Sequence, residues 1–544
     1  MDRRQMLALV LCIGLYYAWV AIKQPFGPAP GEEVVEEPVA EQVQPEAQPE
    51  PVAVVPTPRP ASEFPVRQLP FDQCGATGDW STDGGVLRNL TLRDHRAPFA
   101  VQPLYSWVLG LVTGGSDFPW KPYGEEPDPV TLLGPEGDAL ALGAGDVGAA
   151  AVSMRVVSED PLIMEGVTED GLSARLEVLS SDEEPCVTHV RASWKNESGS
   201  AYNGPVWVGV HDLLPEPPGG MLGRYSSIRQ VLATVDGDLE YGPTDDFEVP
   251  VPVEGPLSWF GLADKYFALF VLPTDGEGSF TFNNRGEKRG GTFLSDVQIA
   301  RGQVHQQDLR VYIGPMDLDV MRAVDQSLNE AVDLGLFAFF AHPLLFLLKV
   351  FHSGVQNWGL SIILLTLLVK LVFFPMTQKA FKSGQAMSAL QPEMKRLKEE
   401  FKDDQEELNK RTLALFQKHK VNPLGGCLPM FIQFPVWVAL YNVLLSSVDL
   451  YHTRFLYLKD LSSPDPYCIL PAIVVGLMML QQQFTPTGNM EPAQARMMKL
   501  MPLMFGVLFF TFPSGLVVYI FMNVSLSILQ QWIIRRNFPI PAPA

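Results

Sequence analysis

Uninterrupted apolar runs lie at both ends of this chain of 544 residues, and a long polar region separates them. The first run covers residues 6–22, which as an α-helix would be about 26 Å long, close to the thickness of the hydrocarbon core of a bilayer. Five further runs follow in the last third of the chain, at residues 359–374, 424–448, 467–484, 497–512 and 515–534. The pattern predicts a polytopic α-helical membrane core with six transmembrane helices.

The N-terminal run could be a retained anchor or a cleaved signal peptide. Arg3 and Arg4 precede it, and its end, around Trp19 and Ile22, lacks a small-x-small cleavage site. We therefore expect residues 1–23 to form a retained transmembrane anchor. Residues 24–63 are rich in Pro, Glu and Gln, a composition that cannot bury a core, and they are expected to form a disordered acidic tether.

Short stretches of alternating apolar and polar residues dominate residues 64–321. Residues 174–179 (Ala-Arg-Leu-Glu-Val-Leu) are an example, and turn sequences such as Asn-Glu-Ser-Gly separate the stretches. This texture predicts an all-β domain folded as an antiparallel sandwich. Residues 334–350, apolar and aromatic but interrupted by His342-Pro343, favour an amphipathic helix that lies at the membrane interface.

Charge is divided unevenly along the chain and sets the expected orientation. Residues 1–333 carry a net charge of −28 and residues 334–544 a net charge of +7, so a nucleic-acid-binding front half is excluded. The loop at residues 376–422 has ten Lys and Arg residues, whereas the loop at residues 449–466 has two. The positive-inside rule therefore places the first loop and both chain ends in the cytoplasm and the β domain outside.

The basic loop at residues 376–422 has the pattern of a helical hairpin. Apolar residues recur at helical spacing from Leu390 to Phe401, opposite charges stand four residues apart, and Asp403-Asp404 interrupts the pattern. A hairpin of this size is long for a simple connector, so we expect a cytoplasmic docking element. Its candidate docking residues are Lys395, Arg396, Lys398, Lys410 and Arg411.

A single full charge, Lys370, lies inside the five C-terminal apolar runs away from their ends. It stands about 6 Å from the cytoplasmic end of its run, with Thr366 one turn deeper on the same helix face. The lysine could extend its ammonium to the headgroups, or it could line a water-filled cavity open to the cytoplasm. Polar residues in other runs support the cavity: Gln433, Asn442, Gln481–Gln483, Thr511 and Asn523.

Residue types point to no enzyme, cofactor or metal. The runs from Gly359 onward contain no Asp, Glu or His, and the chain has no GxSxG, HExxH or GxxxxGK[ST] motif and no cluster of Cys and His. Cys74 and Cys186 could form a disulfide if the β domain is extracytoplasmic, but spacing alone leaves this open.

Several motifs resemble the YidC family of membrane protein insertases. They run in order through the C-terminal third, and a further block lies in the β domain. The matching segments are Asn357 to Thr366, Lys370 with Pro375, Val421 to Pro429, Gln433 to Pro435, Asp465 to Tyr467, Phe512 to Leu516, Trp259 to Phe267 and Tyr312 to Pro315. The likeness to Gram-negative members with a large periplasmic domain extends over nearly the whole chain.

This resemblance implies an inner-membrane insertase and chaperone that inserts, folds and helps to assemble integral membrane proteins, alone or with the Sec translocon. It implies a hydrophilic groove that is open to the cytoplasm and to lipid, with Lys370 at the position of the family's groove cation. Thr366 and Gln433 match groove-lining positions, Tyr519 stands where relatives carry aromatic residues, and Asn523 is expected beside them. Implied partners are nascent membrane proteins, the ribosome, the Sec translocon and the lipid bilayer.

Other classes of function remain as alternatives. A small-solute channel or transporter would call for inverted repeats or rings of charge, neither of which is visible in these runs. A structural role in envelope assembly would place the essential activity in the β domain.

Overall fold

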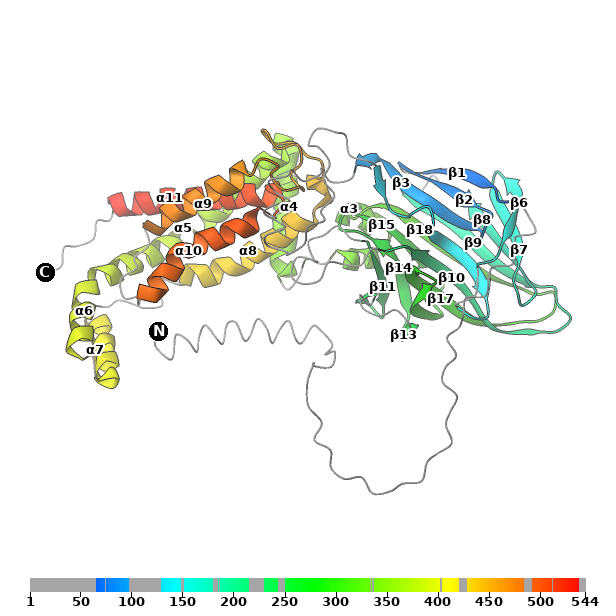
Figure 1. Cartoon of the computed structure of the whole chain (residues 1–544), viewed down its shortest axis with the longest axis horizontal. Helices are drawn as coiled ribbons and strands as arrows, with labels where there is room; N and C mark the ends of the chain where they lie inside the picture. Colours follow the sequence, from blue (N-terminus) through cyan, green and yellow to red (C-terminus); the bar gives the residue numbers. More distant parts are fainter. Residues whose placement is uncertain are drawn as a thin grey trace, which may run out of the picture.

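The computed structural model describes residues 65–73, 75–96, 129–147, 151–179, 184, 186–214, 229–242, 250–332, 334, 337–401, 404–419, 428–483, 492–510 and 512–537. The predicted anchor at residues 1–23 and the tether at 24–63 lie outside this part of the chain. The described residues form a β domain, followed by a set of apolar helices (Figure 1).

Two antiparallel sheets make up the β domain. The first has the order β1 (Gln68–Gln73), β2 (Ala76–Ser81), β3 (Val86–Arg96), β5 (Asp138–Ala144), β10 (Tyr202–Asp212), β17 (Lys288–Ile299), β16 (Ser279–Arg285) and β13 (Val251–Val253), with β4 (Pro129–Thr131) beside β3. The second has the order β12 (Asp238–Tyr241), β11 (Gln230–Val235), β14 (Leu257–Ala263), β15 (Phe267–Pro273), β18 (Val304–Pro315), β9 (Val187–Asn196), β8 (Leu172–Leu179), β7 (Leu162–Val167) and β6 (Met154–Glu159).

Alternation along the strands builds the core between the two sheets. In β9, Val190, Ala192 and Trp194 are buried in the core, while His189 and Arg191 point to the other side of the sheet. The opposite sheet contributes alternate residues of β10 to the same core, namely Val206, Val208 and Val210. The predicted β-sandwich is therefore confirmed. Cys186, just before β9, is in a disulfide bond, and Cys74 lies outside the described residues.

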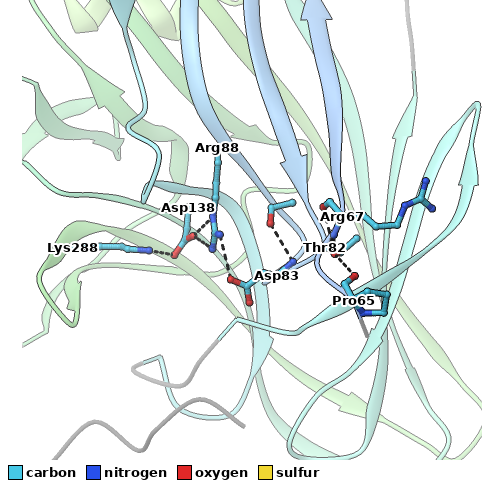
Figure 2. Close-up of polar contacts among 8 residues, drawn as sticks. Pro65, Arg67, Thr82, Asp83, Arg88, Asp138 and Lys288 are labelled. Carbon is cyan, nitrogen blue, oxygen red and sulfur yellow. Dashed lines mark hydrogen bonds and ion pairs between the residues drawn. The ribbon is translucent and has the colours of Figure 1, made fainter. Parts of the chain in front are cut away.

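A buried carboxylate joins three strands of the first sheet (Figure 2). Asp138 at the start of β5 is 3% exposed and accepts hydrogen bonds from Arg88 Nη2 of β3 at 2.9 Å and from Lys288 Nζ of β17 at 2.7 Å. Burial alone would raise the pKa of Asp138, but Lys288 and Arg88 outweigh it and lower that pKa. This ion cluster is a cross-link within the sheet.

The helices after the β domain account for the predicted membrane runs. α5 (Trp358–Ala389), α8 (Leu428–Ser446), α9 (Ile469–Gln483), α10 (Pro492–Phe509) and α11 (Ser514–Asn537) correspond to the five C-terminal runs. Among the described residues, α4 (Ala338–Val355) and the stretches Trp358–Met387 and Ser514–Arg536 are long and apolar enough to cross a membrane. Large apolar side chains such as Leu371 (61% exposed) and Met504 (69%) point outward, as expected for contact with lipid.

The helix expected at the membrane interface is α4, and it is longer and more regular than the sequence suggested. It continues through Pro343, which the sequence analysis treated as an interruption. Ala341, Leu344 and Leu348 are buried against the bundle, while Phe346 is 66% exposed. Its length also permits a membrane span, so the interfacial orientation stays a prediction.

The basic loop contains two short helices that pack against each other. α6 (Gln391–Glu400) and α7 (Gln405–Lys418) share a small apolar cluster in which Leu390 and Met394 meet Leu415 and Phe416. The start of one helix therefore lies beside the end of the other, so the pair is antiparallel. In Figure 1 it lies at the end of the helical bundle that faces away from the β domain.

The β domain is joined to the helices by an apolar cluster and by ionic contacts. One cluster contains Trp259 and Phe270 of the second sheet, residues of α3 (Leu318–Val324) and the 3₁₀ helix η2 (Gln326–Ala331), and residues of the membrane helices. Lys349 of α4 pairs with Asp317 at 3.1 Å, and also with Asp319 and, at 3.8 Å, with Asp449 of the α8–α9 loop.

A tight turn of the β domain contributes to the same junction. Tyr266, between β14 and β15, packs on Tyr451 of the α8–α9 loop with ring centroids 4.8 Å apart. The turn is held by Asp264, whose Oδ1 accepts hydrogen bonds from the main-chain N–H groups of Tyr266 and Phe267, each at 2.7 Å. Burial raises the pKa of Asp264 from 3.8 to about 6.

We expect Asp264→Asn to remove a pH-dependent part of the stability. Because folding raises the pKa of Asp264, this carboxyl stabilises the folded state below about pH 4, and that stabilisation is lost as the pH rises through about 6. A pKa shift of two units corresponds to about 3 kcal/mol in the free energy of unfolding. Asn can accept the same two hydrogen bonds without titrating. Unfolding followed by tryptophan fluorescence between pH 4.5 and 7.5 should therefore show a flatter profile for the variant. Identical profiles would contradict this role.

Candidate functional site

The ammonium of Lys370 lies between two membrane helices. Lys370 Nζ donates a hydrogen bond to Ser527 Oγ of α11 at 2.8 Å, and Ser527 Oγ donates to the main-chain carbonyl of Asn523 at 2.7 Å. Lys370 stands about 18 Å along α5 and Ser527 about 20 Å along α11, counted from the ends of the two helices that lie nearer the β domain. The ammonium thus has a partner at its own depth.

Two other predicted groove residues are buried on these same two helices. Thr366, one turn from Lys370, is 1% exposed, and its hydroxyl donates to the carbonyl of Ile362 in its own helix at 2.6 Å. Tyr519 of α11 is also 1% exposed, and its hydroxyl has no hydrogen-bond partner among the described residues. Asn523, one turn further along α11, is half-buried.

The remaining predicted residues divide into three cases. Gln433 lies on α8, but its side chain is outside the described set. Asn442, another polar residue of that run, donates to the carbonyl of Leu334 at 2.9 Å and so has a structural partner. The five docking residues of the hairpin are all exposed and lie on α6 and α7, and among the described residues none of them is hydrogen-bonded to Lys370: Lys395, Arg396, Lys398, Lys410 and Arg411.

The sequence analysis missed three polar residues of α11. Ser527, Gln530 and Gln531 follow Asn523 along the helix, and both glutamines are buried, at 6% and 5% exposure. A signal was present, because Tyr519, Asn523, Ser527 and Gln531 stand at strict four-residue spacing in a run whose other residues, apart from Ser525 and Gln530, are apolar. Ser527 was not predicted as a site residue because a serine hydroxyl in a helix commonly donates its hydrogen bond to a carbonyl of the preceding turn.

The α8–α9 loop closes the end of the bundle nearest the β domain. Asp460, 3% exposed, accepts hydrogen bonds from the main chain of His452 and Ser462 and from the hydroxyls of Ser462 and Ser463. The loop is tied to the start of α11, where the hydroxyl of Ser514 donates to the carbonyl of Ser463 at 2.7 Å. These hydrogen bonds hold the loop against the bundle at the end nearest the β domain.

The site offers hydrogen bonds and one positive charge. Among the described residues, no group of three or more His, Cys, Asp or Glu side chains is placed to hold a metal ion. Between α5 and α11, Lys370 is paired with the hydroxyl of Ser527, and a cation held in this way suits recognition of a polar or acidic chain segment. A bundle of apolar helices with a large β-sandwich at one end defines a class of polytopic membrane protein with a β domain outside the bilayer.

Comparison with known proteins identifies the family. The family model described as "60Kd inner membrane protein" matches residues 350–541, and "YidC periplasmic domain" matches residues 161–347. The chain is 32% identical over 562 residues to the membrane protein insertase YidC of Geobacter metallireducens, covering 99% of each chain. For that of Anaeromyxobacter dehalogenans strain 2CP-C the identity is 35% over 578 residues, with the same coverage. This chain belongs to the YidC family of membrane protein insertases.

Solved structures of the same family are also similar. An active YidC insertase with its first transmembrane domain resolved has 16% identity and a TM-score of 0.35, with 85% of this chain and 91% of that chain covered. YidC from Thermotoga maritima has 13% identity and a TM-score of 0.27, with 86% and 99% covered. The family assignment confirms the predicted combination of a helical membrane core with a β-sandwich domain and makes this an inner-membrane protein with a periplasmic β domain, while the number of six transmembrane helices stays a prediction.

Proposed function

We propose that this protein inserts integral membrane proteins into the inner membrane and assists their folding and assembly. The observation that carries the proposal is the ammonium of Lys370, held within the bundle by Ser527 while the α8–α9 loop closes the opposite end. A cation in this position attracts an acidic client segment from the cytoplasmic side. Gln433 and Asn523 are the side chains that the client meets beside it, while Thr366 and Tyr519, each 1% exposed in this structure, become accessible to the client only when the helices move apart.

Insertion then needs no covalent step and no cofactor. The polar part of the client enters near Lys370, while its apolar segment leaves along the helices into lipid. Burial of apolar surface, at about 0.8 kcal/mol per CH₂ group, supplies the driving force. The membrane potential adds about 2.3 kcal/mol per charge for each 100 mV when an acidic segment moves outward. The direct partners are nascent membrane proteins and the lipid bilayer.

Removing the β domain tests where the activity lies. Lys370 and Ser527 belong to the helices, so a chain lacking residues 65–315, with the N-terminal segment joined directly before α3, should still insert a small single-span client at a rate within about threefold of the full chain. Insertion would be measured in proteoliposomes by protease protection of the client. A stably folded deletion variant that inserts nothing would place the activity in the β domain. A full-length chain that inserts no client would contradict the proposed function.

The hairpin of α6 and α7 is proposed to dock clients, ribosomes or the Sec translocon on the cytoplasmic side, with both chain ends in the same compartment. Its exposed cations and its position opposite the β domain support this orientation. Cysteines introduced at Lys398 or Lys410 should react with a membrane-impermeant maleimide only from the cytoplasm. A cysteine at Asp296, which is exposed on β17, should react only from the periplasm. Any reversal would overturn the proposed topology.

A further inference from the structure

The hydroxyl of Ser527 links the charged side chain to the backbone of the neighbouring helix. It accepts a hydrogen bond from Lys370 Nζ and donates one to the carbonyl of Asn523. A lysine stem is flexible and could otherwise turn toward the headgroups. The contact with Ser527 keeps the charge at one depth and on the side of α11, so this serine controls where an acidic group is recognised.

The polar residues of α11 share one side of the helix. With 3.6 residues per turn, Tyr519, Asn523, Ser527, Gln530 and Gln531 fall within about 120° of arc. Ser525 and Leu529 lie on the opposite side, where Leu529 is 50% exposed. From Tyr519 to Gln531 the series extends over about 18 Å, a large part of the hydrocarbon thickness. The residues form a largely polar track, interrupted by Ile520 in the same arc, that ends toward the cytoplasm.

Two amides at the cytoplasmic end of this track are buried with unmet hydrogen bonds. Nε2 of Gln530 and Oε1 of Gln531 have no hydrogen-bond partner among the described residues, although both side chains are more than nine-tenths buried. Polar groups in a membrane require a partner or water. One unpaired atom is a donor and the other an acceptor. Together they match the carbonyl and N–H of a polypeptide main chain, which every client carries whatever its sequence.

We propose that Ser527 is a positioning residue for Lys370, and that Gln530 and Gln531 continue the same track as a site for the main chain of the entering client. The inference rests on the proposed insertase function for its ligand. Lys370 and Ser527 then select for acidic client segments, whereas the two amides bind clients of any charge. Substitution of Ser527 should therefore affect only acidic clients, whereas substitution of both glutamines should affect all clients.

The first experiment measures hydration without using insertion. Cysteines are placed singly at positions 527, 530, 531 and 529 in a full-length chain whose Cys12, Cys427 and Cys468 are replaced by Ser. Because thiolates form in water and not in lipid, a water-soluble maleimide added to the cytoplasmic side should label positions 527, 530 and 531 at least about tenfold faster than position 529. Equal labelling rates at all four positions would show that the track is not hydrated, whether or not the variants insert clients.

The second experiment measures insertion of paired clients that differ only in having an acidic or a neutral translocated segment. Ser527→Ala should slow the acidic client by about threefold to tenfold and spare the neutral one, because a hydrogen bond to a charged group is lost. Ser527→Thr should restore the rate, and Ser525→Ala is the matched control. In a Lys370→Met background Ser527→Ala should have no further effect. Additive losses, or equal losses for both clients, would overturn the positioning role.

Gln530→Leu with Gln531→Leu should slow both clients to the same degree. A loss confined to the acidic client would contradict main-chain recognition, as would unchanged rates for both. The wild-type chain could insert neither client while cysteines at positions 527, 530 and 531 still label rapidly. That result would contradict both the proposed function and the proposed client site. The hydrated track would stand as a separate finding.

Discussion

Lys370→Glu should abolish the insertion of clients with acidic translocated segments at normal expression, with a loss of at least about tenfold. The substitution replaces an attraction by a repulsion of similar size, and two unit charges 4 Å apart at an effective dielectric constant of 20 interact by about 4 kcal/mol. A Glu carboxylate could accept a hydrogen bond from Ser527 only if the hydroxyl gave up its present bond to the Asn523 carbonyl, so Lys370→Gln serves as the uncharged comparison. The measurement is protease protection of acidic and neutral clients in inverted membrane vesicles.

Two further substitutions separate charge from anchoring. Lys370→Arg keeps the charge and should retain function, while Lys370→Gln should have an intermediate effect that is confined to acidic clients. A lysine that only reached the headgroups would lose at most the cost of its own burial, about 2.5 to 3.5 kcal/mol on insertion scales, regardless of the client. If Lys370→Glu inserts acidic and neutral clients equally well, the electrostatic role is wrong.

Asp460→Ala should destabilise the closed end of the bundle by about 3 to 5 kcal/mol. The side chain accepts four hydrogen bonds in a site that is 3% exposed, and its removal strands the buried N–H groups of His452 and Ser462. We expect a lower unfolding midpoint in detergent and faster proteolysis of the α8–α9 loop from the periplasmic side of spheroplasts.

Two further variants test whether the hydrogen bonds of Asp460 stabilise the α8–α9 loop. In Asp460→Asn one oxygen can still accept three of the four hydrogen bonds, so the loss should fall to about 1 kcal/mol. Asp296→Ala, which removes an exposed carboxylate from β17, should leave the midpoint unchanged. Equal midpoints for Asp460→Ala and Asp296→Ala would show that the network does not stabilise the loop.

Local patterns in the sequence predicted the elements well but not their partners. The alternation in β9 and the apolar runs of α5 and α11 follow from residue periodicity alone. The pairing of β10 with β17 does not, because these strands lie far apart in the chain and many registers would bury equally apolar faces. Leu390 and Met394 were recognisable as one face of the hairpin, whereas their partners Leu415 and Phe416 were not.

The candidate site shows the same division. Lys370 was visible as an isolated charge in an apolar run, yet its partner Ser527 could be found only from the packing of α5 against α11. Asp460 gave no signal, since one aspartate in a short loop is typical of a solvated turn. Its role depends on four donors that the fold brings around it.

α5 is a single helix of 32 residues, so it is about 48 Å long and extends well beyond the hydrocarbon core. Its last residue, Ala389, adjoins the hairpin and is 19 positions beyond Lys370, which is about 28 Å along the helix axis. An extended polypeptide covers this distance with about eight residues. A client with fewer than about eight polar residues ahead of its apolar segment cannot contact the hairpin and Lys370 at the same time. The length of α5 therefore sets the shortest polar segment with which a client can bind both sites.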